Sequence, residues 1–256
     1  MPNTMDGDTI IPIFGQFLLI IAIISSVNQI FRFQNAGNKL FRTIALITQI
    51  FPFFFLVFAF ISDFSSLKLV TEYGGADLPL LYRISAVWGG RAGPLLLFAA
   101  LMSIVTWLMT EREMLDYDVR IMHGFTLGIL VISWFLEPFA NSAGVTPSEL
   151  NPLLQTDLMV IHPPVVFFYY ALCIATAAVA MGGVISGKSA KDIHESQLHW
   201  ARAGFLAGTI GIGLGGLWAY TVLDWGGYWA WDPVETGSIL PWLSLIHISE
   251  PTRPSS

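Results

Sequence analysis

Six long stretches without a charged residue constrain the fold of this chain more than any other feature. Asp, Glu, Lys and Arg are absent from residues 9–31, 43–62, 92–110, 121–136, 158–187 and 203–223. A helix needs about 20 apolar residues to cross the hydrocarbon core of a bilayer. The fourth stretch falls short, and Phe139 and Ala140 extend it beyond Glu137. The sequence therefore predicts an all-α fold, a polytopic membrane helix bundle with six transmembrane helices.

The composition agrees with a membrane protein and excludes several other classes. Hydrophobic residues make up 54% of the chain and charged residues 12%, whereas soluble domains carry about a quarter charged residues. A net charge of −6 excludes a nucleic-acid binder, which needs a basic surface. The single Cys excludes a disulfide framework and the CxxCH motif by which c-type cytochromes hold haem. Membrane lipid is thus the first expected partner.

A seventh apolar stretch is too short to span a membrane as it stands. It covers residues 236–249, and Glu250 and the prolines after it end the helix. A helix that stops inside lipid leaves its last carbonyls without partners. We therefore expect a truncated seventh helix, with residues 1–245 forming an incomplete membrane domain and residues 246–256 forming a non-native or disordered tail. The alternative is a short interfacial helix followed by a soluble tail.

The basic residues predict which side of the membrane each connection faces. Eight of the twelve Lys and Arg lie in the segments after the first, third and fifth predicted helices. The positive-inside rule places these segments in the cytoplasm. The N-terminus and the segments 63–91, 137–158 and 223–235 then face the periplasm, with the chain as a multi-pass protein of the bacterial inner membrane.

One of these outer segments is unusually rich in aromatic residues. Residues 225–231 read Trp-Gly-Gly-Tyr-Trp-Ala-Trp. Glycines let a backbone approach a flat ligand, and indole rings offer wide apolar faces with an N–H group at the rim. The segment is therefore interpreted either as a platform for a planar ligand such as a porphyrin or a quinone, or as part of the usual interfacial belt of Trp and Tyr.

Two acidic residues follow the aromatic segment. Asp232, Pro233 and Glu235 have the pattern of a helix start, with Asp as N-cap, Pro at the first position and Glu closing a capping box. Asp232 has a second interpretation, in which its carboxylate orients a Trp N–H or a ligand group. The two interpretations are compatible.

His162 is a candidate iron ligand at the outer mouth of the fifth predicted helix. The prolines at 163–164 are expected in the first helical turn, where a missing N–H costs nothing. A neutral imidazole binds iron readily, and the alternative is a solvated interfacial histidine. The other histidines form no metal constellation: His123 begins the fourth helix on the cytoplasmic side, and His194 and His199 lie in a charged cytoplasmic segment.

Taken together, these segments resemble the CcmF-type cytochrome c biogenesis (haem lyase) family. The aromatic segment is similar to the tryptophan-rich WWD motif of haem-handling membrane proteins. The segments 151–155, 162–164 and 214–220 narrow the resemblance to the N-terminal part of that family. The resemblance runs from the first predicted helix to about Leu243.

The resemblance implies a function that residue spacing alone does not. It implies a subunit of the cytochrome c haem lyase, which receives haem from a periplasmic haem chaperone and helps to attach it to the CxxCH motif of apocytochrome c. The implied cofactors are the transferred haem and a b-type haem, and the implied partners include other cytochrome c maturation subunits. Family members are much longer, so the chain alone is expected to be inactive. The alternatives are a non-catalytic quinone- or lipid-binding subunit and a haem exporter of a related WWD family.

The resemblance also assigns candidate residues, although no catalytic residue among them. It makes His162 a ligand of the haem iron and makes the WWD loop at 223–236 the docking site for haem or its chaperone. His247 lies only one turn beyond residues 241–243, too close to carry the b-type haem role. The candidate haem-binding residues are His162, Trp225, Gly226, Gly227, Tyr228, Trp229, Trp231, Asp232 and Glu235.

Overall fold

The regular elements of the chain are helices throughout the part that the computed structural model describes, which is residues 7–31, 39–112, 116–223 and 226–250. Six helices are long and apolar enough to cross a membrane, so the predicted all-α membrane bundle is confirmed. The elements are α1 (Gly7–Phe31), α2 (Lys39–Ile61), α3 (Lys68–Tyr73), α4 (Leu80–Ala86), α5 (Ala92–Glu111), α6 (Asp116–Phe135), the 3-10 helix η1 (Pro152–Leu154), α7 (Asp157–Ile185), α8 (Ala190–Thr221) and α9 (Pro233–Ser249).

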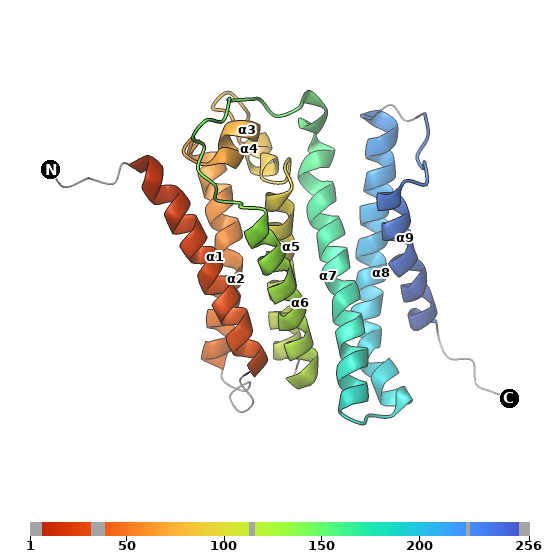
Figure 1. Cartoon of the computed structure of the whole chain (residues 1–256). Helices are drawn as coiled ribbons and strands as arrows, with labels where there is room; N and C mark the ends of the chain where they lie inside the picture. The colour runs from red at the N-terminus through yellow and green to blue at the C-terminus, as the bar shows by residue number, and fades with distance from the viewer. Residues whose placement is uncertain (1–6, 32–38, 113–115, 224–225, 251–256) are drawn as a thin grey trace.

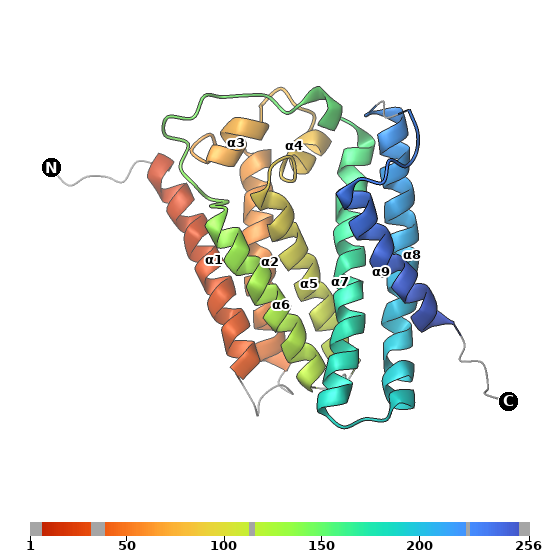
Figure 2. The same cartoon turned by 45° about the vertical axis from the view of Figure 1, so that its right-hand side comes forward.

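The long helices run side by side (Figure 1). Helices α1, α2, α5 and α6 pack together, α7 packs on α5 and α6, and α8 and α9 follow in turn. The last turns of α1, α5 and α7 and the first turns of α2, α6 and α8 lie at one end, called here the basic end. Helices α3 and α4 cover the opposite end, called here the capped end (Figure 2). The two ends of the bundle therefore differ in structure.

A row of glycines on α8 sets its distance from α7. A Cβ atom added to Gly208 would lie 2.7 Å from Cε2 of Tyr169, and one added to Gly211 would lie 3.1 Å from Cγ2 of Val166. Small residues let membrane helices approach closely, so any larger side chain here would force the two helices apart. The glycines that contact α7 in this way are Gly204, Gly208, Gly211 and Gly215.

Helix α7 begins at Asp157, well before the prolines that were expected in its first turn. The Thr156 side chain accepts a hydrogen bond from the N–H of Met159 and caps the helix. The prolines at 163–164 therefore lie inside α7 and not in its first turn, which corrects that prediction. The first of them has no N–H for the carbonyl of Met159, and Nε1 of Trp88 donates to this carbonyl instead, at 2.7 Å. This bond ties the start of α7 to the segment after α4.

Helix α8 also begins earlier than predicted. The Ser189 side chain accepts from the N–H of Asp192 as N-cap, and the helix continues from Ala190 to Thr221. The prediction that His194 and His199 lie in a loop is therefore wrong, because both lie on α8. The first turns of α8 are polar, and they lengthen the helix at the basic end beyond its apolar part.

Helix α9 corresponds to the short seventh helix. It has 17 residues and ends at Ser249, where the sequence placed its end. Residues 246–249 are helical although the predicted tail begins at 246, and residues 251–256 lie outside the described residues. Whether the tail is native stays a prediction.

Candidate functional site

A pocket of about 150 Å³ lies at the capped end, between α7, α8 and the start of α9. Apolar side chains form much of its wall, among them Val166, Ile212 and Leu223. Polar groups from three separate segments converge on it: His162, Trp218, Trp229, Asp232, Glu235 and Ser238. An apolar cavity with a few convergent polar groups is the usual form of a ligand site.

The His162 ring is held in one tautomer by the backbone of α8. Its Nδ1 lies 3.0 Å from the carbonyl oxygen of Gly211. A carbonyl oxygen only accepts hydrogen bonds, so in the neutral imidazole Nδ1 carries the proton and Nε2 keeps its lone pair. Gly215 makes room for the ring, because a Cβ there would lie 2.8 Å from its Cε1. In this tautomer Nε2 is the ring nitrogen without a proton.

Two tryptophans of the pocket have hydrogen-bond donors without an acceptor in the described part of the chain. Nε1 of Trp218 and Nε1 of Trp229 are buried and have no partner among the described residues. The Trp218 ring also meets His162 edge to face, with ring centroids 5.7 Å apart. Buried N–H groups are normally paired, so the pocket has two donors for which the described residues supply no acceptor.

The carboxylates of Asp232 and Glu235 fix the backbone at the start of α9. Asp232 Oδ1 accepts from the N–H of Glu235 at 2.6 Å, and Glu235 Oε2 accepts from the N–H of Ala230 at 2.9 Å and of Asp232 at 3.3 Å. The predicted capping box is confirmed. Both residues also line the pocket, so the same carboxylates that shape the loop lie next to the cavity.

The other candidates in the WWD loop lie outside the pocket lining. Trp231 is 70% exposed, and its φ of 59° places a bulky residue in the left-handed region. Tyr228 is exposed and stacks on Tyr220, with centroids 4.3 Å apart. Trp231 reaches the pocket indirectly, since its ring meets that of Trp229 at 5.6 Å. The loop therefore presents one Trp inward and other aromatic rings outward.

Gly226 and Gly227 of the WWD loop also lie outside the pocket lining. Gly226 has a φ of 70°, a conformation that favours glycine, and neither Gly226 nor Gly227 has a neighbour within 4 Å of an added Cβ. Trp225 lies outside the described residues. Thus His162, Trp229, Asp232 and Glu235 are brought together, while Gly226, Gly227, Tyr228 and Trp231 lie around them.

The described residues contain no cluster of three or more His, Cys, Asp or Glu side chains suited to a bare metal ion. A metal ion bound to His162 would therefore need most of its ligands from another molecule. The iron of a porphyrin already has such ligands. Residue-level reading of the sequence missed Gly211 and Gly215, which position the imidazole. The feature that could have revealed these two residues is the regular spacing of glycines along α8.

Comparison with known proteins agrees with the family resemblance predicted from the sequence. The family model described as Cytochrome C assembly protein matches residues 88–248. The CcmF cytochrome c-type biogenesis protein of Escherichia coli (strain K12) is 34% identical over 81% of this chain, and the NrfE protein of Haemophilus influenzae is 31% identical over 93%. These matches cover 34% and 41% of the two relatives, so the chain spans well under half of their length.

A solved structure, the cytochrome c heme lyase CcmF, has the same fold. It superimposes with a TM-score of 0.72 over 96% of this chain and 43% of that protein, at 21% sequence identity. At this identity the likeness concerns the arrangement of helices. The predicted all-α fold with six membrane-spanning helices agrees with it.

Proposed function

The chain belongs to the cytochrome c assembly protein family, and from this premise we propose that it forms the haem-docking part of a cytochrome c haem lyase. In this proposal it corresponds to the N-terminal part of the longer relatives. It receives haem from a periplasmic chaperone and presents it to apocytochrome c, whose CxxCH cysteines are joined to the haem by thioether bonds. The remaining helices of the lyase and other maturation subunits complete the activity.

The geometry of His162 carries this proposal. Its Nδ1–H donates to the carbonyl of Gly211, which would leave the Nε2 lone pair to bind haem iron. Ligand histidines are generally held by such a bond from the other ring nitrogen. The pocket beside it is mainly apolar, as a porphyrin edge requires.

The size of the pocket suits docking more than enclosure. Its volume of about 150 Å³ is below the roughly 300–1,000 Å³ of pockets that bury a whole ligand. It has room for one edge of the macrocycle, with the exposed rings of Tyr228 and Trp231 beside the rest. The indole N–H groups of Trp218 and Trp229 would donate to haem carboxylates. Partial burial is appropriate for a haem that must be passed on.

The proposed orientation follows from the fold and the distribution of charge. The pocket lies at the capped end, opposite the connections that carry most basic residues. The positive-inside rule places the capped end in the periplasm, where the haem chaperone and apocytochrome c would meet it. The protein is then a multi-pass protein of the bacterial inner membrane with a periplasmic N-terminus.

Haem titration of the purified chain tests the proposal. The wild-type chain in detergent should bind haem and give a Soret band, and His162→Ala should lose most of it. Trp231→Ala should weaken binding, because an exposed face of the platform is removed. His199→Ala, at the basic end of α8, is the matched control and should bind as the wild type does. Haem binding unaffected by both site changes, or bound quinone without a Soret band, would contradict the proposal.

A further inference from the structure

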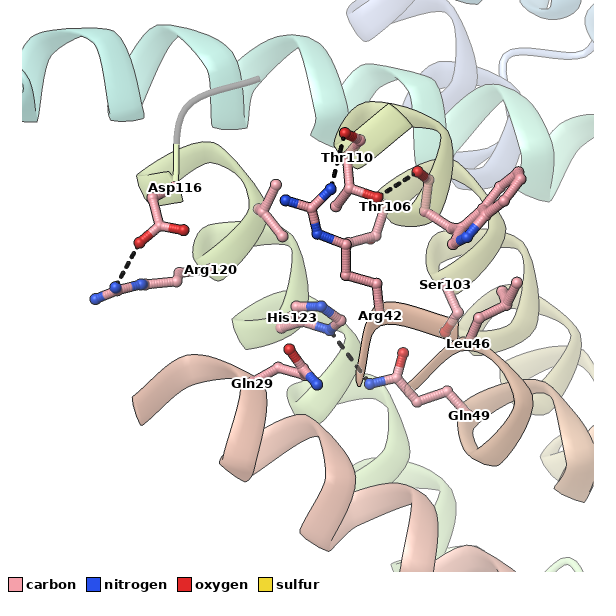
Figure 3. Close-up of a pocket in the computed structure, with 12 residues that line it drawn as sticks. Gln29, Arg42, Leu46, Gln49, Ser103, Thr106, Thr110, Asp116, Arg120 and His123 are labelled. Carbon is pink, nitrogen blue, oxygen red and sulfur yellow. Dashed lines mark hydrogen bonds and ion pairs between the residues drawn. The ribbon is translucent and has the colours of Figure 1, made fainter. Parts of the chain in front are cut away.

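A second pocket, of about 40 Å³, lies at the basic end between α1, α2, α5 and α6 (Figure 3). It is separate from the WWD loop, which lies at the capped end. Its walls come from the last turns of α1 and α5 and the first turns of α2 and α6. These turns lie toward the ends of four helices that are long and apolar enough to cross a membrane.

Gln49 has a buried acceptor in this pocket without a partner. Its side chain is 1% exposed, and its Nε2 donates to Oγ of Ser26 at 2.9 Å and to Nδ1 of His123 at 3.2 Å. The Ser26 hydroxyl donates to the carbonyl of Ala22 and can only accept from Gln49, which fixes the orientation of the amide. Gln49 Oε1 has no hydrogen-bond partner among the described residues. A ligand here should therefore carry a donor.

Trp107 supplies a donor of the same kind. It lines the pocket from α5, and its buried Nε1 has no acceptor among the described residues. Since an indole has one polar atom and that atom only donates, it requires an acceptor from a ligand. The pocket thus presents one unpaired donor and one unpaired acceptor, and a matching ligand needs both functions.

Two arginine side chains line the pocket. Arg42 donates from Nη1 to the carbonyl of Thr110 at 3.2 Å, which holds its guanidinium across the end of α5 (Figure 3). Arg120 pairs with Asp116 at 2.6 Å. Two guanidinium groups and one carboxylate therefore line the pocket. Arginine is the residue best suited to phosphate oxygens.

We propose that this pocket binds a phosphate group with a hydroxyl on it or next to it, as in the glycerophosphate headgroup of an anionic phospholipid or in hydrogen phosphate. The phosphate oxygens accept from the Trp107 N–H and face the Arg42 guanidinium. The hydroxyl donates to Gln49 Oε1. A choline headgroup has no hydroxyl and no net negative charge, so it does not fit this pattern.

Native mass spectrometry of the purified full chain tests the proposal. Phosphatidylglycerol and phosphatidylcholine with identical acyl chains are added separately, and one phosphatidylglycerol should bind at least about tenfold more tightly than phosphatidylcholine. Arg42→Gln and Trp107→Phe should each weaken phosphatidylglycerol binding about tenfold, the effect of one hydrogen bond to a charged group. Arg202→Gln, which removes an exposed arginine from the first half of α8, is the control and should bind as the wild type does.

A second measurement identifies the source of the phosphate. Hydrogen phosphate that raises the thermal midpoint of the wild type, but not of Trp107→Phe, and displaces phosphatidylglycerol supports a site for the free anion. Phosphatidylglycerol binding without a phosphate effect supports a lipid site. Equal affinity for the two lipids with no effect of hydrogen phosphate overturns the proposal, as does unchanged binding of both ligands in Trp107→Phe. The Trp107 variant keeps an aromatic ring in place, so it decides the matter if Arg42→Gln does not fold.

Discussion

Replacing Gly215 by Ala should displace the imidazole ring of His162. The new Cβ would lie 2.8 Å from Cε1 of His162, whereas carbon atoms pack at about 3.5–4.0 Å. The ring must retreat by roughly 1 Å to restore ordinary contact. Its Nδ1 lies 3.0 Å from the Gly211 carbonyl, and a separation beyond about 3.5 Å no longer makes a hydrogen bond.

The expected magnitude follows from the loss of that hydrogen bond. Removing a group that orients a ligand histidine commonly lowers metal affinity by about 10–100-fold. Helix propensity acts in the opposite direction, because Ala is more favourable than Gly in a helix by about 1 kcal/mol. A weaker affinity for haem would therefore come from the contact with His162 and not from a weaker α8.

Soret titration of the two purified glycine variants measures the effect. Gly213→Ala is the matched control, because it lies on the same helix and its added Cβ has no neighbour within 4 Å. The dissociation constant for haem should rise about 10–100-fold in Gly215→Ala and stay near the wild-type value in Gly213→Ala. Equal dissociation constants in the two variants would refute the argument that Gly215 and Gly211 position the imidazole.

Three further predictions concern the framework around the site. Asp232→Ala removes the N-cap of α9 and should lower the free energy of unfolding by about 1 kcal/mol, measured by denaturant titration in detergent; an unchanged value would exclude a capping role. Trp88→Phe leaves the Met159 carbonyl without its donor and should lower the free energy of unfolding by about 1–3 kcal/mol. The more exposed Trp134→Phe should change it little, and similar losses in the two variants would contradict this role of Trp88. Gly208→Ala should lower the free energy of unfolding by about 1–3 kcal/mol through overpacking against Tyr169, and a more stable variant would show that α7 and α8 are not held at this distance.

The membrane helices were predictable because charge is excluded from lipid over a fixed length. The gaps between charged residues located α1, α2, α5, α6, α7 and α8 within a few residues, apart from the start of α8. That start was missed because charged residues at 191–202 are compatible with a helix that extends beyond the membrane. The short helices α3 and α4 were also missed, since six or seven residues give too little periodicity.

The candidate site was predictable where the signal was local. The Asp232–Glu235 capping box depends on residues three apart and was found from the sequence. The bond from His162 to Gly211 joins residues 49 positions apart, and the one from Trp88 to Met159 joins residues 71 apart. Such contacts depend on how α7 packs on its neighbours. The same reason hid Gln49 and Trp107, which looked like ordinary residues of apolar helices.

The most direct test of the account is the identity of the iron ligand in the haem-loaded chain. Electron paramagnetic resonance of the wild type should show an axial nitrogen ligand, which His162→Gly should lose. Added imidazole should restore the wild-type spectrum in His162→Gly, because the pocket beside the vacated side chain admits it. A His162→Gly variant that binds haem with the wild-type spectrum in the absence of imidazole would contradict the assignment of His162 as the haem ligand.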